Sequence, residues 1–377
     1  MLMKCPYCEN NLLNRRCNFC GLLFNFCSKK HPVPSWAIYC PQLSHGNPPV
    51  AKISDDFNLV ELNLPPIEED AEAEPVMLAG NLYFWNRNKG WLWIWNSYEW
   101  DKVVLGNKGE IGYYRIGLRA IISVFNPEER ILSFYSVAAL SGDYDSIKAI
   151  KTFNNAVSRL FEFNGRLCFF NQNGLAQLIF GQKLLEYENI QKRPLTNGII
   201  KDVKVITDLR MRERIILEYE TEKKVFTISN KSNADLLPLS MPIKWQVLKM
   251  IDNEKYLVQT NDGQMGILNL RGNIEYIGCK YGSVSSNGKI FGIDENGQIN
   301  MIIIGNNIKK INLKIGLDNV IFFIDKYLVG SFSGKIRVIS PEGRIIFESQ
   351  KRLFSLRFFY DKYGIALKGK GNEWFIL

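Results

Sequence analysis

Histidine is almost missing from this sequence of 377 residues. His31 and His45 are its only two histidines, and residues 46–377 contain none. Their absence excludes a Ser-His-Asp or Cys-His catalytic site, and a histidine-based metal centre, from most of the chain. Chemistry by Asp, Glu, Lys or Tyr stays open, but we expect that the protein is not an enzyme.

Long apolar runs are lacking as well. The longest, Val320–Ile324 and Met301–Ile304, have the length of strands and fall far short of the ~20 residues that cross a membrane. The N-terminus has no apolar signal region, so we expect a cytoplasmic protein with reduced cysteines and no membrane contact. Cys168 and Cys279 each lie beside apolar strand residues and are expected to be small buried hydrophobes.

The sequence does contain a cluster of six cysteines and two histidines within residues 1–45. Cys5 and Cys8 form one Cys-x-x-Cys pair, and Cys17 and Cys20 form another. Thiolates two residues apart on a tight turn both reach one ion about 2.3 Å away, so two pairs complete a tetrahedral zinc site. A disulfide framework would need an oxidising compartment and a redox pair would need a βαβ context, and the sequence indicates neither.

A second set of ligands, Cys27, His31, Cys40 and His45, brings the total to the eight that two tetrahedral zinc ions require. Two alternatives stay open. Water or another residue replaces His45, or the sites are cross-braced and the first Cys-x-x-Cys pair shares an ion with Cys27 and His31. Short connecting loops favour sequential sites. Four protein ligands per ion predict two structural Zn²⁺ ions, whose binding supplies most of the folding free energy of so short a module.

The stretch Cys27-x3-His31-Pro-x-Pro-x-Trp, followed by Cys40-Pro, resembles a bacterial variant of the zinc ribbon. Residues 1–47 as a whole resemble a double zinc ribbon. They depart from the usual pattern at Cys40-x4-His45, which stands where a second Cys-x-x-Cys pair is usual. Because of this departure, the identity of the last ligand of the second site stays open. The resemblance implies a zinc-binding module at the start of the chain.

The net charge of +9 is unevenly distributed. Residues 1–50 carry +4, residues 51–75 carry −7, and the remainder carries +12 in scattered positions. The segment Pro65–Pro75 is acidic and bounded by prolines, so residues 48–75 are predicted to hold a strand and an exposed linker. Scattered lysines are typical of a solvated surface, whereas a nucleic-acid footprint would gather them in one stripe.

Turns and short strands repeat through residues 76–377. Short β-branched and aromatic runs alternate with turns rich in Gly, Asn and Asp. Eight such turns recur at a spacing of roughly 34–49 residues, which predicts a β-propeller with three or four strands per unit. Four of these turns have closely similar sequences, and four more are comparable. The first four are Asn171–Gly174, Asn261–Gly263, Glu295–Gly297 and Phe332–Gly334, and the other four lie near 89–90, 127–128, 221–222 and 370–371.

The turn count favours eight blades, with seven as the alternative. The alternating segment 58–64 is predicted to be the outer strand of the last blade, where it would close the ring and remove an unpaired sheet edge. The repeats resemble the WD-repeat and quinoprotein-like propeller superfamily in their turn-and-strand pattern only, because the Gly-His and Trp-Asp signatures of true WD repeats are absent. The expected fold is all-β, with a β-propeller preceded by a small zinc-ribbon module.

Tryptophan is concentrated in one segment, since five of the eight lie within residues 85–100. The run Trp91–Trp95 is apolar on both faces, which predicts an inner strand covered on both sides. Core packing is the default interpretation of this group. The alternative is an aromatic patch that grips a partner peptide, and Trp85 and Trp100, near the loops, are its candidates.

These features predict a non-enzymatic scaffold for protein–protein interaction, and we expect it to be a subunit of a larger bacterial complex in signalling or defence. A propeller presents loops on a rigid ring, and a tethered zinc ribbon raises the effective concentration when both modules engage one assembly. Fold-level analogy carries this expectation. The alternative is a nucleic-acid-binding protein that uses the ribbon and a basic propeller face, with binding that depends steeply on salt.

Overall fold

A computed structural model of the chain describes residues 69–377 with short gaps, and before them only seven short strand pieces. Two compact units emerge, one of residues 1–195 with 358–377 and one of residues 196–357. In the described residues no helix is long and apolar enough to cross a bilayer. The pieces are 11–13, 16–17, 24–26, 32–34, 39–40, 51–52 and 60–62, and the gaps are 96–98, 117–118, 142–145, 181–184, 193–199, 211, 229–233, 253, 285–287, 306, 324–326, 341–342, 354–356, 362–363 and 370–372.

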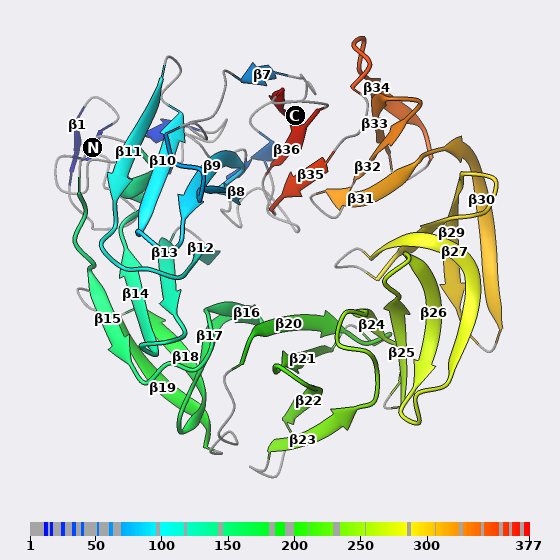
Figure 1. Cartoon of the computed structure of the whole chain (residues 1–377), viewed down its shortest axis with the longest axis horizontal. Coiled ribbons are helices and arrows are strands. Elements are labelled where there is room, and N and C mark those ends of the chain that lie inside the picture. Colours follow the sequence, from blue (N-terminus) through cyan, green and yellow to red (C-terminus); the bar gives the residue numbers. More distant parts are fainter. Residues whose placement is uncertain are drawn as a thin grey trace. The chain divides into compact units, whose positions relative to one another are not determined.

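The first unit contains four larger sheets of four strands each (Figure 1). In three of them every strand pairs antiparallel with its neighbour in the chain. This up-and-down order is the topology of a propeller blade. The strands are β8 (Glu74–Leu78), β9 (Asn81–Asn86), β10 (Trp91–Trp95) and β11 (Trp100–Val104); β12 (Glu110–Ile116), β13 (Arg119–Asn126), β14 (Ile131–Tyr135) and β15 (Lys151–Asn154); β16 (Phe161–Phe163), β17 (Arg166–Asn171), β18 (Gly174–Phe180) and β19 (Leu185–Lys192). The 3-10 helix η3 (Val137–Ser141) follows β14.

The fourth sheet joins strands from far apart in the sequence. Its order is β35-β36-β37-β7, and β7 pairs antiparallel with β37, with Leu62 opposite Trp374 and Val60 opposite Ile376. Residues 60–62 of the predicted strand 58–64 thus form the outer strand of this sheet. The strands are β7 (Val60–Leu62), β35 (Arg357–Tyr360), β36 (Ile365–Lys368) and β37 (Trp374–Ile376).

Three short antiparallel pairs occur among the described pieces before residue 60. Each is a two-stranded sheet of two or three residues per strand. The pairs are β1 (Leu12–Leu13) with β2 (Arg16–Cys17), β3 (Phe24–Phe26) with β4 (Pro32–Pro34), and β5 (Tyr39–Cys40) with β6 (Ala51–Lys52).

The second unit contains two four-stranded sheets and one sheet of seven strands. In the seven-stranded sheet β27 takes part in two meanders, because its first half pairs with β26 and its second half with β28. A register shift between Lys280 and Ser283 separates the halves. The strands are β20 (Asp202–Thr207), β21 (Glu213–Glu218), β22 (Lys223–Ile228) and β23 (Ala234–Leu239); β24 (Gln246–Met250), β25 (Lys255–Gln259), β26 (Gln264–Asn269), β27 (Ile274–Val284), β28 (Ile290–Ile293), β29 (Gln298–Ile304) and β30 (Ile308–Gly316); β31 (Asn319–Phe323), β32 (Tyr327–Phe332), β33 (Lys335–Ile339) and β34 (Ile345–Glu348).

The four aligned hairpin turns are confirmed. Each stands directly before a strand, namely β18, β26, β29 and β33. Their glycines all have positive φ, which L-residues with a side chain rarely adopt: Gly174 (127°), Gly263 (82°), Gly297 (72°) and Gly334 (81°).

Several turns share one hydrogen-bond pattern, in which an Asn or Asp side chain accepts backbone N–H groups two to four residues on. Asn86 Oδ1, for example, accepts from the backbone nitrogens of Asn88 (3.0 Å) and Lys89 (2.9 Å). Such Asx turns explain why Asn and Asp mark the sequence repeats. The same pattern occurs at Asn126, Asn269 and Asp294.

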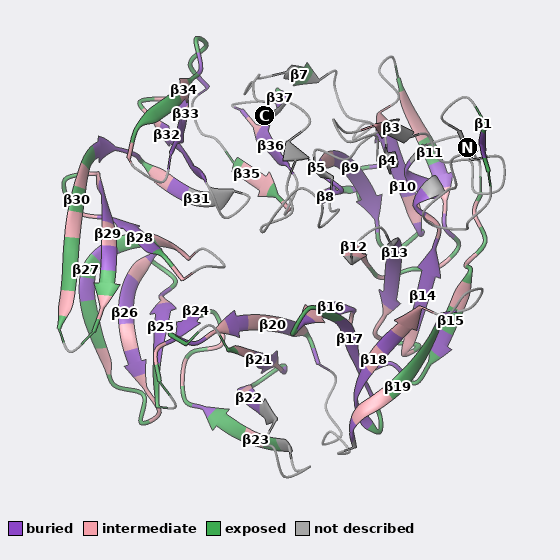
Figure 2. Cartoon of the chain, turned by 180° about the vertical axis from the view of Figure 1, so that it is seen from behind, coloured by how far each residue is buried: buried purple, intermediate pink, exposed green. Residues whose placement is uncertain are grey.

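The core lies between neighbouring sheets and is richest on their middle strands (Figure 2). In β10 the central residues Leu92, Trp93 and Ile94 are all buried, so the predicted inner strand is confirmed. Outer strands such as β23 are largely exposed (Figure 2). Cys168 and Cys279 are buried as expected, and burial raises the pKa of the Cys279 thiol.

Within the first unit, aromatic side chains pack the sheet β35-β36-β37-β7 against the sheet of β8 to β11. We call this cluster, formed by Phe84, Trp93, Trp100, Phe359 and Trp374, the aromatic seam. The ring centroid of Phe84 lies 5.2 Å from that of Trp100 and 5.3 Å from that of Trp374, both edge-on, a geometry that aromatic pairs favour.

The same two sheets approach closely at a pair of glycines. A Cβ atom at Gly364 would lie only 2.3 Å from the carbonyl oxygen of Gly80, so any side chain there would force the backbones apart. The backbone nitrogen of Gly80 donates to Asp361 Oδ2 at 2.9 Å. The chain ends of the first unit are therefore joined by strand pairing, by aromatic packing and by this contact.

The acidic linker is less exposed than its sequence predicts. Asp70 and Ala73 are buried, and β8 already begins at Glu74. Asp70 accepts hydrogen bonds from Asn86 Nδ2 (2.6 Å) and Trp93 Nε1 (3.2 Å). The prediction of an exposed connector is wrong at these positions, because a buried carboxylate is stable where amide and indole donors satisfy it.

Candidate functional site

The predicted zinc ligands fall largely outside the described residues. Of the eight, only the backbones of Cys17 and Cys40 are described, in β2 and β5. Each lies in a short antiparallel pair, with Cys17 opposite Leu12 and Cys40 opposite Ala51. Both zinc sites stay predictions. The ligands outside the described residues are Cys5, Cys8, Cys20, Cys27, His31 and His45.

Of the two tryptophans predicted to bind a partner, Trp85 belongs to the core. It is 5% exposed, and its indole N–H donates to the carbonyl oxygen of Gly109 at 2.7 Å. A side chain that is buried and hydrogen-bonded in this way offers no surface to a partner, so this interpretation of Trp85 is corrected.

Trp100 lies half-buried on the outer strand β11. Its ring packs against Phe84 and, at 5.5 Å between centroids, against Trp95. Its indole nitrogen is buried and makes no hydrogen bond to any described residue. The seam accounts for its packing, and a partner-binding role for Trp100 stays a prediction.

A pocket of about 220 Å³ opens on the sheet β20–β23 of the second unit. Strand register puts Asp202, Glu218 and Lys223 in one cross-strand row, and Lys204 beside Ile216 in the next row on the same face. The segment that leads into β24 forms the other wall. We call the whole lining the charged pocket: Asp202, Lys204, Ile216, Glu218, Lys223, Ile243, Lys244, Gln246 and Val247.

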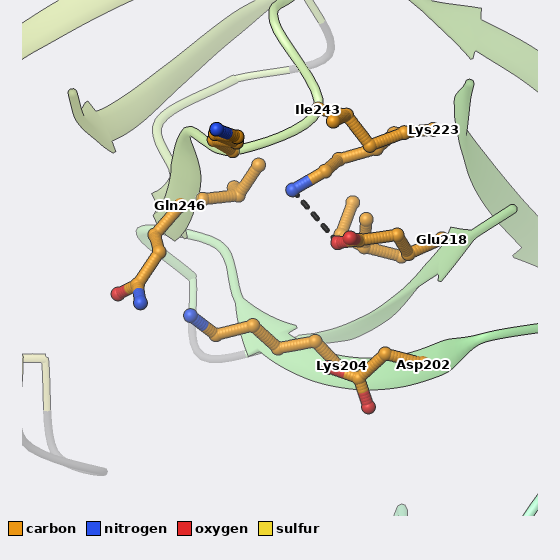
Figure 3. Close-up of a pocket in the computed structure, with 9 residues that line it drawn as sticks. Asp202, Lys204, Glu218, Lys223, Ile243 and Gln246 are labelled. Carbon is orange, nitrogen blue, oxygen red and sulfur yellow. Dashed lines mark ion pairs between the residues drawn. The ribbon is translucent and has the colours of Figure 1, made fainter. Parts of the chain in front are cut away.

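One of the pocket's lysines is committed to internal contacts. Lys223 is buried, and its Nζ lies 2.8 Å from Glu218 Oε2 and donates to the carbonyl oxygen of Trp245 at 2.6 Å. Figure 3 shows this ion pair on one side of the pocket. The Lys204 side chain extends away from it, toward Gln246 (Figure 3).

Lys204 is half-buried and takes no part in the Lys223–Glu218 ion pair. Its amine makes no hydrogen bond or ion pair with another residue that the structure describes. Burial lowers the pKa of Lys204 and the nearby Lys223 lowers it further, while Asp202 and Glu218 oppose the shift. The arrangement is an amine held among charges in a cavity, with no direct counter-ion among the described residues.

Sequence reasoning missed this pocket. Asp202 and Lys204 alternate with Val203 and Val205, a pattern that predicts a strand with one polar face. The pattern does not say that Glu218 and Lys223 lie beside that face, because cross-strand register depends on the hairpin turns between them.

The buried aspartates of the described sheets are satisfied by their own surroundings. Asp208 accepts from the backbone nitrogens of Arg210 (2.9 Å) and Arg212 (2.8 Å) and from Arg212 Nε (2.7 Å). Burial alone would raise the pKa of Asp208, but these hydrogen bonds and the Arg212 charge lower it below the ordinary range. Hydrogen bonds likewise lower the pKa of the buried Asp70 and of the half-buried Asp294 against the effect of desolvation. A general acid at neutral pH needs the opposite shift.

The sequence matches no protein-family model. It matches no curated protein either.

Three solved structures illustrate what the chain is similar to in shape. BamB from Moraxella catarrhalis is 10% identical over 85% of this chain and 96% of its own, with a TM-score of 0.35. A catalytically inactive virginiamycin B lyase from Staphylococcus aureus, solved with quinupristin, is 12% identical over 77% and 98%, with a TM-score of 0.38. The β-propeller domain of Cps50 (Swd1) from Myceliophteria thermophila is 10% identical over 81% and 99%, with a TM-score of 0.36. At TM-scores this low the likenesses decide nothing about this chain.

Proposed function

We propose that this chain is a non-enzymatic scaffold for protein–protein interaction, built of two zinc ribbons and a β-propeller. Support for the propeller comes from the sheet topology, since four-stranded meanders follow one another along the described part of the chain. Counting β27 in both of its meanders gives eight units, and counting the seven-stranded sheet once gives seven. We favour eight blades, which agrees with the eight turns of the sequence.

The observation that carries the non-enzymatic role is the use of buried carboxylates. The buried Asp70 and Asp208 and the half-buried Asp294 accept hydrogen bonds from neighbouring groups of the chain, and their pKa values are lowered. Groups held in this way stabilise turns and strand contacts. Catalytic carboxylates more often show raised pKa values in a cleft.

Two structural Zn²⁺ ions belong to this proposal. The spacing of the six cysteines and two histidines supports them, and thiolate ligands require a reducing compartment, which supports a cytoplasmic location. The full chain purified without chelator is expected to contain two zinc ions. Cys5→Ser and Cys40→Ser are each expected to remove one, and a wild-type content below two ions would contradict the second site.

Affinity purification of the full chain from its native cells tests the scaffold role. Stoichiometric protein partners that remain bound after nuclease treatment would support it. Recovery of the chain without any protein partner, at an expression level that leaves both modules folded, would count against it. The variant Cys5→Ser separates partners of the ribbon from partners of the sheets.

Nucleic-acid binding is the second candidate, and the basic charge of residues 76–377 favours it. It predicts that affinity for a duplex or single strand falls steeply as salt rises, because bound lysines and arginines displace counter-ions. Affinity that barely changes between low and physiological salt would exclude this candidate and leave the protein scaffold.

A further inference from the structure

We propose that the charged pocket of the second unit binds a carboxylate group carried on a short aliphatic stem. This inference goes beyond the scaffold role and does not depend on the zinc ribbons, because all nine lining residues lie within residues 202–247.

The size of the pocket limits what it holds. Its volume of about 220 Å³ is below the roughly 300–1,000 Å³ of pockets that take cofactors and drug-sized ligands. A nucleotide or a flavin does not fit such a space. A chain of a few carbon atoms with one polar end does fit, whether it comes from a small molecule or from a side chain of a bound protein.

The lining combines an apolar part with an amine. Ile216 and Val247 are buried and Ile243 is half-buried, so together they offer aliphatic contacts to the stem of a ligand. Lys204 extends into the same space (Figure 3). A carboxylate at this amine would form the charge-assisted hydrogen bond that Lys204 lacks among the described residues.

Charge favours a carboxylate over a phosphate. The lining holds three lysines and two acids, and the Lys223–Glu218 pair is already neutral in itself. Of the remaining charges in the lining, Lys204 and Lys244 are positive and Asp202 is negative, which leaves one positive charge for a ligand to balance. A monoanionic carboxylate balances it, whereas a phosphate dianion would add an uncompensated negative charge beside Asp202.

Methyl NMR of the full chain with labelled isoleucines tests the proposal, because Ile216 and Ile243 report from the pocket wall. The variants I216V and I243V assign the two signals. Butyrate is the probe, n-butanol the uncharged control and inorganic phosphate the competing anion. Saturable shifts of both signals with butyrate, absent with butanol and at least several-fold weaker with phosphate, are the expected result.

Lys204→Met should weaken butyrate binding roughly tenfold or more, since a hydrogen bond to a charged group contributes about 1.5–3 kcal/mol. Lys201→Met is the matched control, because Lys201 is exposed just before β20 and pairs with Glu220 at 3.2 Å; its affinity should equal that of the wild type. Unchanged binding by the Lys204 variant, or equal shifts with butanol or phosphate, would overturn the proposal.

A chemical readout covers the case in which the Lys204 variant does not fold. Saturating butyrate should slow modification of Lys204 by an amine reagent in the wild-type chain and leave modification of Lys201 unchanged; equal rates at Lys204 with and without butyrate would also overturn the proposal. Glutamate with blocked backbone ends distinguishes the source of the carboxylate. If it binds as well as butyrate, the pocket accepts the side chain of a bound protein, and if only butyrate binds, the pocket takes a free small carboxylate.

Discussion

The aromatic seam and the charged pocket solve the same packing problem in opposite ways. Each lies where one face of a four-stranded sheet meets the element packed on it, the seam in the first unit and the pocket in the second. In the seam, rings such as Phe84 and Trp374 fill the space and touch edge-on. In the pocket, strands of the same topology present Lys204 and Asp202, and a cavity remains.

The difference lies in side-chain size and charge rather than in backbone. Large rings fill a gap between sheets to the density of a protein interior, and such packing is a major source of stability. Charged side chains keep a distance that water or a ligand fills. We therefore expect the seam to dominate stability and the pocket to dominate recognition.

The variant Trp374→Ala should break the seam and have the largest effect. Trp374 is 1% exposed and contacts Phe84 and Phe359, so its loss leaves a cavity that costs about 3–5 kcal/mol of unfolding free energy. Urea denaturation followed by circular dichroism measures this. Trp374→Phe is the control, because it keeps a ring and should cost about 1–2 kcal/mol. Equal losses in both variants would show that the seam does not act through packing.

Asp70→Ala, at the carboxylate that accepts from the seam residue Trp93, should have the next largest effect. The change leaves the buried donors Asn86 Nδ2 and Trp93 Nε1 without their acceptor, which costs about 1–3 kcal/mol. Glu72→Ala, an exposed acid of the same segment, should change stability by less than about 0.5 kcal/mol. A similar loss in both variants, measured by the same denaturation, would contradict the local role of Asp70.

Acid should weaken both units through one buried aspartate in each, Asp70 in the first and Asp208 in the second. The native pKa values of Asp70 and Asp208 lie below the ordinary value of 3.8, so the unfolded chain takes up protons first as pH falls. Their stabilisation is therefore complete above about pH 5 and is lost as pH falls through the lowered native values. Denaturation between about pH 6 and pH 3 should show a smaller loss in Asp70→Asn and Asp208→Asn than in the wild type. Parallel pH curves would exclude these groups as the cause.

The sequence could predict the strands of both regions but not what lies between the sheets. Hairpin turns follow from Asn, Asp and Gly at fixed positions, and the apolar run Trp91–Trp95 predicts an inner strand. Burial of Asp70 could not be read from its acidic, proline-bounded surroundings, because the donors of Asn86 and Trp93 reach it only in the folded sheet. Trp85 looked accessible for the same reason, since its acceptor at Gly109 comes from the turn before the next sheet.

Lys204→Met should have the smallest effect on stability. The sign of this effect distinguishes the pocket from the seam, because the seam variants should lower stability and this one should raise it. The native pKa of Lys204 lies below the ordinary value of 10.5, chiefly because of burial. The unfolded chain therefore binds the proton more tightly, and the charged amine lowers stability at neutral pH. Removing it should raise the melting temperature slightly at neutral pH. The gain should shrink as pH rises through the lowered native value toward 10.5, and the amine is neutral in both states only above that ordinary value.

A fall in melting temperature would mean that Lys204 supports the fold as the seam residues do, and that the pocket is only a packing defect. A small rise, together with weaker butyrate binding in the same variant, would mean that Lys204 serves binding and does not support the fold. The chain would then keep a destabilising amine because of what it binds, which is the usual relation between stability and function at a site. Thermal scans of Lys204→Met and Lys201→Met at neutral pH and near pH 10 decide between the two.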